Sequence, residues 1–235
     1  MNLIEFFTKP EFQRKYELMY ESIAEAERNV MSELYTLFGG VSTIIDTLSK
    51  SYNILPYHNL QHAFLVASNS INLYNKATTP DVGSHERKTL LMAALFHDAG
   101  HSGGAKTDSE NIYTACAILA KFSKDNPHIN FNLGEACLAI HKTEYVDSGF
   151  PHSPSNLIQD VLRDADLLAS FTSSNHPQQL LGLKQEMGLE CTDLELIEQN
   201  VNFIKGALFY TYHGQAKANE YIGQAEAVLN CKRKE

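Results

Sequence analysis

The chain has 235 residues, of which 43% are hydrophobic and 20% are charged, as in an ordinary soluble globular protein of one domain. Its net charge of −9 gives no reason to expect nonspecific nucleic-acid binding, and a polyanionic substrate would need local positive charge, for example from divalent cations. No apolar run approaches the length of a membrane span, and residues 1–5 do not begin a signal peptide. We therefore expect a cytoplasmic protein that binds neither nucleic acid nor membrane.

The four cysteines are widely scattered and include no CxxC pair. Cys116 and Cys137 lie in apolar helical runs, where cysteine packs as a small core residue. This usage favours reduced thiols in a cytosolic compartment.

Apolar residues recur at three- and four-residue spacing along most of the chain, which predicts helices. The first predicted helix covers residues 11–38 and ends at Gly39-Gly40, and a shorter one follows over 42–51. Further helices are predicted over residues 57–74, from an N-cap at Ser84 to the His97-Asp98 pair, and over 108–124, 132–141, 155–170, 177–187, 193–212 and 214–230. No useful stretch alternates with period two, so the sequence predicts an all-α fold. We expect one domain, in which N-terminal helices over residues 1–52 pack on a core over 53–230.

The apolar run from Leu90 to Phe96 ends abruptly in His97, Asp98, Gly100 and His101. Burying this run would bring His97 and Asp98 into the interior, where an ionised carboxylate is costly unless a metal ion compensates its charge. Taken alone, the pair fits equally well a helix C-terminus with a capping histidine and a glycine at C′.

Other segments supply compatible side chains. His58 and His62 are four residues apart on a predicted helix and would share one face. Asp164 and Asp166 alternate in a later helix, which suggests that one carboxylate points inward and the other is solvated. Imidazoles and carboxylates bind divalent ions, and two ions about 4 Å apart can share a hydroxide and neutralise a phosphoryl group. Several separate segments that supply compatible ligand types are a more specific indication of a metal site than any one pair of residues.

The order of these residues is similar to the His…His-Asp…Asp pattern of the HD superfamily of metal-dependent phosphohydrolases. Within it, residues 57–63 and 97–101 resemble the two signatures of class I 3′,5′-cyclic nucleotide phosphodiesterase catalytic domains. Residues 165–167 fit that family's last ligand motif, and residues 109–111 resemble the segment whose glutamate holds metal-bound water. Residues 201–204 have a weaker likeness to the segment that clamps the purine ring. The resemblance runs from about residue 57 to about residue 210 and implies a single compact helical catalytic domain.

Carried over residue by residue, the resemblance implies hydrolysis of a 3′,5′-cyclic nucleotide, cAMP or cGMP, to the 5′-monophosphate. His62, His97, Asp98 and Asp166 would bind the first metal, with Asp98 bridging to the second. Zinc would suit the first site, and magnesium or manganese the second. A metal-bridging hydroxide would attack phosphorus. His58 would protonate the leaving oxygen as a general acid, which an imidazole can do when a carboxylate partner stabilises its charged form.

The resemblance also implies roles outside the metal ligands. His101 and Glu110 would orient metal-bound waters, although Glu110 also fits an acidic first-turn residue that only favours the helix dipole. Asn200 falls where the family usually carries its purine-reading glutamine, and its shorter side chain would move or weaken the base contact. Phe203 would clamp the purine ring, or belong to the core with Leu208.

Several alternatives stay open. His141 is either a second-metal ligand or a solvated helix residue, and the histidines without such context are expected at the surface, namely His85, His128, His152, His176 and His213. The chain could instead be an HD phosphohydrolase for a nucleoside phosphate, a guanosine alarmone or a cyclic dinucleotide, whose extra phosphates would need basic residues such as Lys106 and Lys142. It could also be a metal-bound nucleotide sensor without turnover. Monomer and homodimer are both compatible, because the helix over 11–38 could pack internally or against another subunit.

Overall fold

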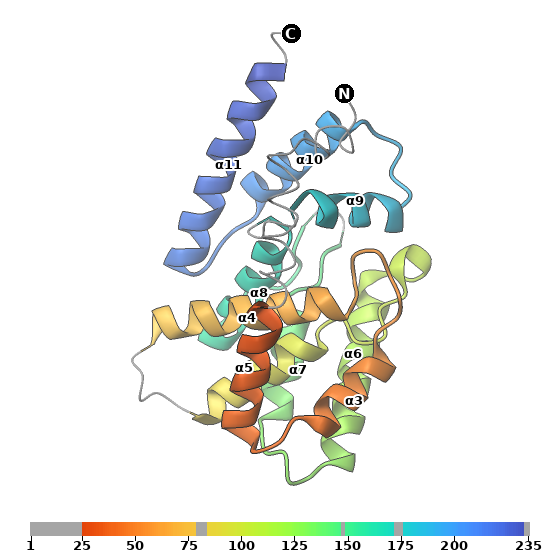
Figure 1. The fold of residues 1–235 in the computed structure, drawn as a ribbon, viewed down its shortest axis with the longest axis vertical. Coiled ribbons are helices and arrows are strands. Elements are labelled where there is room, and N and C mark those ends of the chain that lie inside the picture. The colour runs from red at the N-terminus through yellow and green to blue at the C-terminus, as the bar shows by residue number, and fades with distance from the viewer. Residues whose placement is uncertain (1–24, 79–83, 147–148, 172–175, 233–235) are drawn as a thin grey trace.

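The computed structural model describes residues 25–78, 84–146, 149–171 and 176–232 (Figure 1). These residues form helices and one isolated β-bridge between Val146 and Gly149, and they contain no strand. After a helix over residues 25–38, the elements are α3 Ser42–Ser51, α4 Leu60–Ala77, α5 Ser84–Phe96, the 3₁₀ helix η1 Gly103–Ala105, α6 Asp108–Asp125, α7 Leu133–His141, α8 Leu157–Ala169, α9 His176–Glu186, α10 Asp193–Gly206 and α11 Tyr212–Lys232. The predicted all-α fold is confirmed for the described residues.

Most predicted helices agree with the observed ones to within a few residues. Of the helix predicted over 11–38, residues 11–24 lie outside the described part of the chain. The helix predicted to start at residue 57 begins at Leu60 instead, because the Asn59 side chain caps it by accepting the backbone N–H of Gln61 and of His62. The helix predicted over 193–212 ends earlier, at Gly206.

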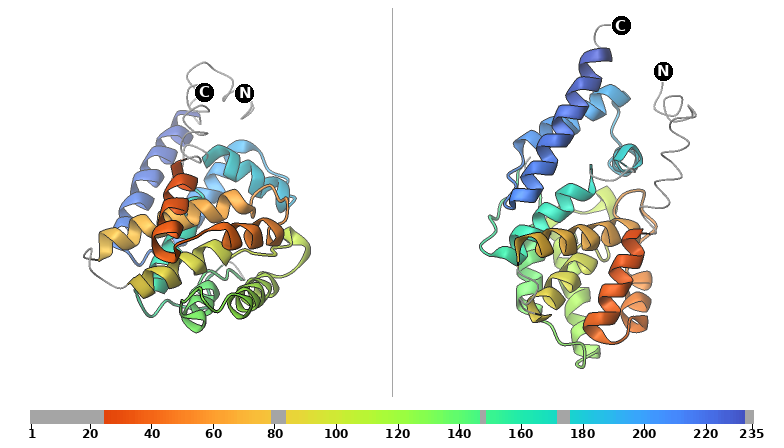
Figure 2. Two further views of the ribbon diagram at one scale, coloured as in Figure 1. Left: turned by 60° about the horizontal axis from the view of Figure 1, so that its bottom comes forward. Right: turned by 60° about the vertical axis from the view of Figure 1, so that its left-hand side comes forward.

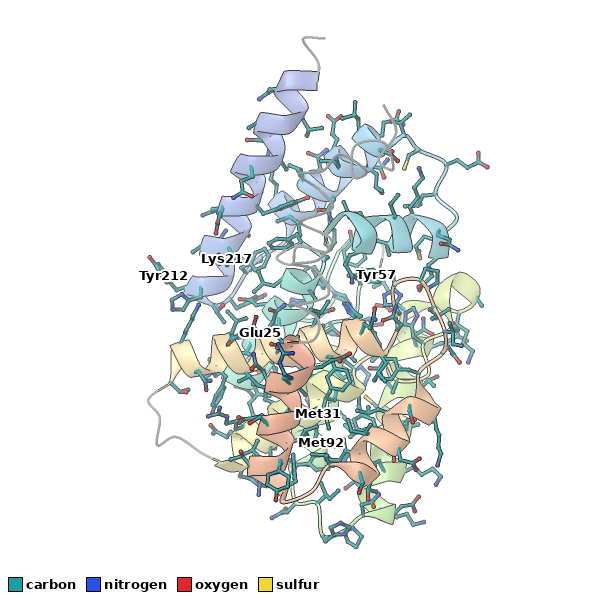
Figure 3. All side chains as sticks on the ribbon, viewed as in Figure 1. Glu25, Met31, Tyr57, Met92, Tyr212 and Lys217 are labelled. Carbon is teal, nitrogen blue, oxygen red and sulfur yellow. The ribbon has the colours of Figure 1, made fainter. Side chains whose placement is uncertain are left out.

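Helices α4, α5 and α8 form the centre of the molecule, where α4 packs along both α5 and α8. Every side chain from Leu90 to Phe96 in α5 is at most 2% exposed. A helix that is apolar all round is buried on all sides, and each buried Leu or Phe contributes about 1.5–3 kcal/mol. Met92, labelled in Figure 3, lies within this core. The apolar run therefore carries the residues that follow it, beginning with His97, into the interior.

The helix over residues 25–38 buries Val30 and Leu34 in the same hydrophobic cluster as α5. The boundary expected near residue 52, between N-terminal helices and core, stays a prediction. Cys116 and Cys137 are half-buried free thiols packed against this cluster. Within the described ranges, no helix has both the length and the apolarity needed to cross a membrane.

The C-terminal helices α10 and α11 pack against each other and extend away from the central helices (Figure 2). Apolar side chains of both helices join the hydrophobic core cluster, and a polar tie is added by the carboxylate of Asp164, which accepts the backbone N–H of Tyr210 at 3.0 Å and of Thr211 at 2.7 Å. The Thr211 hydroxyl donates to the same carboxylate at 2.6 Å. The expectation that one aspartate of the Asp164–Asp166 pair is solvated is therefore wrong, because Asp164 is fully buried and Asp166 is half-buried.

Candidate metal centre and its surroundings

Four ligand-type side chains meet in the helical core. His62 comes from α4, His97 and Asp98 from the turn after α5, and Asp166 from α8. The Nε2 atom of His62 lies 3.3 Å from Nε2 of His97, and it lies 3.5 Å from Asp98 Oδ2 and 3.1 Å from Asp166 Oδ1. His97 Nε2 lies 3.0 Å from the same Asp98 oxygen and 3.6 Å from that of Asp166. The structure thus brings together the four side chains that were predicted as ligands of a first metal.

The spacing of these four atoms fits a cation between them. Metal–ligand bonds of about 2.1 Å place neighbouring ligand atoms roughly 3.0–3.4 Å apart in octahedral or tetrahedral geometry. Two imidazole Nε2 atoms at 3.3 Å repel each other as lone pairs unless a proton or a cation lies between them. The buried Oδ2 atom of Asp98 has no hydrogen-bond partner among the described residues, which is costly for a carboxylate. The residues present therefore fit a divalent cation, with His62, His97 and Asp98 close enough to share one.

Local sequence explains how the ligands are oriented. His97 Nδ1 donates to the carbonyl of Ala94 at 2.8 Å, which leaves its Nε2 lone pair for the cluster. The turn after α5 depends on Gly100, whose φ of 78° lies in the left-handed region. A Cβ at this position would lie 2.8 Å from the side chains of Thr114 and Ile118. Glycine at position 100 is therefore favoured by the backbone turn, and a Cβ there would also displace these two side chains of α6.

The cluster keeps its carboxylates ionised. Burial raises the pKa of the Asp98 and Asp166 carboxyls, but the neighbouring histidines outweigh burial and hold both pKa values well below their usual range. Burial lowers the pKa of His97, but Asp98 and Asp166 outweigh it and raise that pKa well above its usual value. Buried carboxylates that stay ionised at neutral pH create a negative potential that favours a bound cation.

A second group lies next to this cluster and joins His58 to α9. His58 Nδ1 pairs with Oε1 of Glu186, whose other oxygen accepts the backbone N–H of Tyr57 at 3.0 Å and of His58 at 3.1 Å. Tyr57, labelled in Figure 3, lies where the start of α4 approaches α9. Burial lowers the pKa of His58, but the nearby carboxylates, led by Asp98 and Glu186, outweigh it and raise the pKa. The imidazole therefore keeps its proton to higher pH than a free histidine.

His101 supports His58 from the other side. Their rings stack with centroids 3.7 Å apart and planes at 24°. Burial and the His58 charge lower the pKa of His101 to about 4, so it stays neutral beside a protonated His58. The Gly103 N–H donates to His101 Nδ1 at 3.1 Å, and the Asn111 amide nitrogen lies 3.1 Å from Nε2. The contacts of His101 hold and support the His58 imidazole, and the water-orienting role expected for His101 stays a prediction.

Glu186 is the carboxylate partner that the sequence required for His58 without identifying it. It lies 128 positions further along the chain, in a helix with no unusual pattern. Its approach depends on Gly182, one turn earlier in α9, where a Cβ would lie 2.5 Å from the Pro56 carbonyl oxygen. The glycine thus lets α9 touch the loop that carries His58, and this contact was not visible in the sequence.

Glu110 does not join the ligand cluster. It is exposed, its carboxylate accepts the Thr107 backbone N–H at 2.9 Å, and the Thr107 side chain accepts the Glu110 N–H in return. The structure therefore favours the alternative role for Glu110, as the acidic member of a capping box. Asp108, which the sequence analysis did not single out, is half-buried, and its carboxylate accepts the Tyr145 backbone N–H at 2.6 Å. Burial raises its pKa, with smaller contributions from the charges of Asp98 and Asp166.

The predicted substrate residues of α10, Asn200 and Phe203, have different neighbours. Asn200 is buried, and the Tyr221 hydroxyl donates to its side-chain oxygen at 2.5 Å, so Asn200 points toward α11. The expected base contact by Asn200 is therefore not supported. Phe203 is half-buried and borders a cavity of about 400 Å³ together with Asn202. Its ring lies 5.2 Å from that of Tyr145 and also packs against the hydrophobic core cluster, so the clamp and the core alternatives for Phe203 both stay open.

The remaining candidates lie mainly at the surface. His85 and His128 are exposed, as expected. His141 and Lys106 are also exposed, and Lys142 is half-buried. His152 is also exposed, and its Nε2 lies 3.2 Å from the buried Glu144 carboxylate. His213 departs from expectation because it is half-buried, and the side chain of His176 lies outside the described residues.

Comparison with known proteins supports the fold. No family model matches this sequence, and no curated protein matches it. The chain is similar to the crystal structure of the phosphodiesterase domain of the RhoPDE fusion protein from the choanoflagellate Salpingoeca rosetta, with a TM-score of 0.57 and 17% identity. The match covers 88% of this chain and 93% of that domain. The similarity establishes that this chain has the all-α architecture of a phosphodiesterase domain.

Proposed function

We propose that this protein is a metal-dependent phosphohydrolase that cleaves a phosphodiester. The observation that carries the proposal is the pairing of two adjacent groups, namely a four-ligand His/Asp cluster and the His58–Glu186 pair. A binding protein needs the first group but has no use for the second, because binding does not require a leaving group to be protonated. The shared architecture with a phosphodiesterase domain supports the same reaction class.

His62, His97, Asp98 and Asp166 would hold the metal, and the half-buried Asp166 and Asp98 would face a second ion. We infer zinc at the histidine-rich site and magnesium or manganese at a site filled mainly by water. Divalent ions there would neutralise phosphoryl oxygens and lower the pKa of water that attacks phosphorus. The ionised carboxylates of Asp98 and Asp166 prepare the site by attracting the cations before substrate arrives.

His58 acts as the general acid in this proposal. The Glu186 carboxylate fixes the Nδ1 side of the ring, so that Nε2 carries the proton which the leaving oxygen receives. A cation at the cluster offsets the charge of Asp98, which leaves Glu186 as the group that keeps His58 protonated. Neutral His101 stacks on the ring and limits its rotation.

The substrate we propose is a 3′,5′-cyclic nucleotide, cAMP or cGMP, converted to its 5′-monophosphate. The aromatic side chains of Phe203, Tyr145 and Phe150 offer faces on which a purine could stack. Asn202, which borders the same cavity, replaces Asn200 as the amide available to the base.

The test is product analysis of the purified protein with cAMP and with cGMP, in the presence of manganese or magnesium. We expect the 5′-monophosphate, and we expect Asp98→Ala to abolish it. Asp125→Ala, which changes an exposed surface carboxylate of α6, is the matched control and should leave activity unchanged. Hydrolysis of a generic phosphodiester without turnover of either cyclic nucleotide would keep the reaction class and reject the substrate. Nucleotide binding without any product would favour the sensor.

A second substrate class is supported by one observation. An HD phosphohydrolase for a nucleoside phosphate, an alarmone or a cyclic dinucleotide needs positive charge for further phosphates. Neither Lys106 nor Lys142 borders the aromatic cavity. The buried Arg163 does border it, and this positive charge is the observation that favours a substrate with a further phosphate.

A further inference from the structure

The aromatic cavity has an unusual cation in its wall. The cavity of about 400 Å³ lies between α8, the loop before α8 and the end of α10, and the residues that matter here are Tyr145, Phe150, Arg163, Asn202, Phe203 and Tyr210. Among the described residues that border it, Arg163 supplies a positive charge and none supplies a carboxylate. The cavity is therefore electrostatically suited to an anion.

The Arg163 guanidinium is buried without adequate partners. The residue is 3% exposed, and its Nε and Nη2 atoms have no hydrogen-bond partner within the described part of the chain. The guanidinium has a side-chain hydrogen bond to Tyr210, and Asp166 and Asp164 act on it by charge, but no described carboxylate forms an ion pair with it. A buried charge with unpaired donors is costly in the protein interior. The missing partner must offer acceptor oxygens.

The geometry of the guanidinium restricts what that partner is. Its Cζ atom lies 3.9 Å from the centroid of the Phe150 ring and 5.9 Å from that of Tyr210. Aromatic packing fixes the plane of a guanidinium and leaves its edges for hydrogen bonds. The two unpaired atoms share one edge, which is the edge that binds two oxygens of a phosphate or carboxylate at once.

We propose that this cavity is a subsite for an anionic group, a phosphate or a carboxylate, held by Arg163. Arg163 lies three residues before Asp166 on α8, which is less than one helical turn from a candidate metal ligand. The anionic group is therefore distinct from the phosphoryl group at the metal centre, and because cAMP and cGMP carry one phosphate, it belongs to a separate effector or to a substrate of the second class, with a further phosphate. This last step rests on the proposed function, whereas the anion subsite itself does not.

The experiment is calorimetric titration of inorganic phosphate into the full-length protein kept in EDTA, so that metal-bound phosphate does not contribute. We expect one phosphate to bind, and Arg163→Gln to weaken binding at least about tenfold, since a bidentate charged contact is lost. Arg163→Lys, which keeps the charge without the planar fork, should recover only part of the affinity.

A second variant guards against misfolding of the Arg163 variants. Asn202→Asp places a negative charge at the exposed rim of the cavity and should also weaken phosphate binding. Asn130→Asp makes the same change at an exposed position before α7 and should not. Absence of phosphate binding to the unmodified protein overturns the proposal, and so does equal binding by Asn202→Asp and Asn130→Asp.

The metal-loaded enzyme then identifies the source of the anion. Competitive inhibition of phosphodiester hydrolysis by phosphate, weakened by Asn202→Asp, assigns the subsite to a second phosphate of the substrate. Inhibition or activation that leaves KM unchanged assigns it to a separate phosphorylated effector. If the unmodified protein binds phosphate but hydrolyses no phosphodiester, the proposed function alone is rejected. If it hydrolyses a phosphodiester but binds no phosphate in EDTA, the subsite alone is rejected.

Discussion

At the scale of single residues, the site separates two tasks between neighbouring histidines. His62 and His97 face the ligand cluster with their Nε2 atoms, whereas His58 turns its Nδ1 toward a carboxylate outside the cluster. A histidine that binds metal must be neutral, and one that donates a proton must be charged. The partner of each ring therefore decides its chemistry more than its place in the sequence motif does.

This division predicts that His58→Ala keeps metal and loses catalysis. We expect kcat for a cyclic nucleotide to fall about 10²–10⁴-fold, the usual contribution of a general acid. A nitrophenyl phosphodiester should be affected far less, because its leaving group needs little protonation. Metal content and kinetics with both substrates test this, and undiminished turnover of the cyclic nucleotide would remove the acid assignment.

The pH profile gives a second residue-scale prediction. The carboxylates around His58, Glu186 among them, raise the pKa of its imidazole, so removing one carboxylate must lower that pKa. An acid with a lower pKa loses its proton at lower pH, so Glu186→Gln should shift the basic limb of the kcat profile toward lower pH. Asp193→Asn changes another carboxylate near the same end of α9, beside Lys184, and serves as control. Identical basic limbs in Glu186→Gln and the unmodified protein would contradict the pairing.

At the scale of helices, the site depends on close approaches that glycines permit. Gly182 brings α9 onto the Pro56 carbonyl, and Gly214 brings the start of α11 onto the Asp164 carboxylate. In both places the added Cβ would meet atoms that are fixed by hydrogen bonds, namely the loop held by Glu186 and the Asp164–Thr211 pair. Because glycine has no Cβ, α9 and α11 can each pack at this short distance from the neighbouring segment.

Gly182→Ala should uncouple Glu186 from His58. The added Cβ would lie 2.5 Å from the Pro56 carbonyl oxygen, which is closer than real Cβ contacts, so α9 or the loop must move. We expect kcat to fall while metal content is unchanged, because the four ligands come from other elements. Gly223→Ala on α11, where a Cβ meets nothing within 4 Å, is the control. Equal activity of the two variants would show that the approach of α9 is not required.

Gly214→Ala should lower stability without touching the site directly. Its Cβ would lie 2.8 Å from the Thr211 hydroxyl and against the Asp164 carboxylate, which disrupts the bonds that begin α11. Losing buried bonds to a charged group costs about 1.5–3 kcal/mol in the free energy of unfolding. Thermal unfolding of Gly214→Ala and of the control Gly223→Ala measures this loss of stability. Equal Tm values for the two variants would contradict the prediction.

At the scale of the whole molecule, the sequence predicted best what local pattern determines. Helix positions follow from periodicity, and the candidate metal ligands combine rare side chains with an apolar run that has to be buried. Glu186 and Arg163 escaped notice because each lies in a helix of ordinary composition, and only the packed fold brings them to His58 and to the cavity. For Glu110 the sequence left two roles open, because its local motif fits both a water-orienting residue and an acidic first-turn residue, and the structure shows the capping box. The contact of Asn200 with Tyr221 of α11 also depends on helix packing and had no signal in the sequence.

The metal cluster joins α4, α5 and α8, so metal removal should destabilise the entire fold. Without a cation, two imidazoles and two ionised carboxylates stay close together in the core, and binding to the folded state alone stabilises it by about 2.7 kcal/mol at a hundredfold excess over Kd. For a chain of this size such a change corresponds to a Tm shift of roughly 5–10 °C. Thermal unfolding with and without a chelator measures the shift, and zinc or manganese added back should restore it. Asp98→Ala should unfold at one temperature under both conditions. A chelator-independent Tm in the unmodified protein would mean that these four side chains hold no metal, and the hydrolytic proposal would lose its basis.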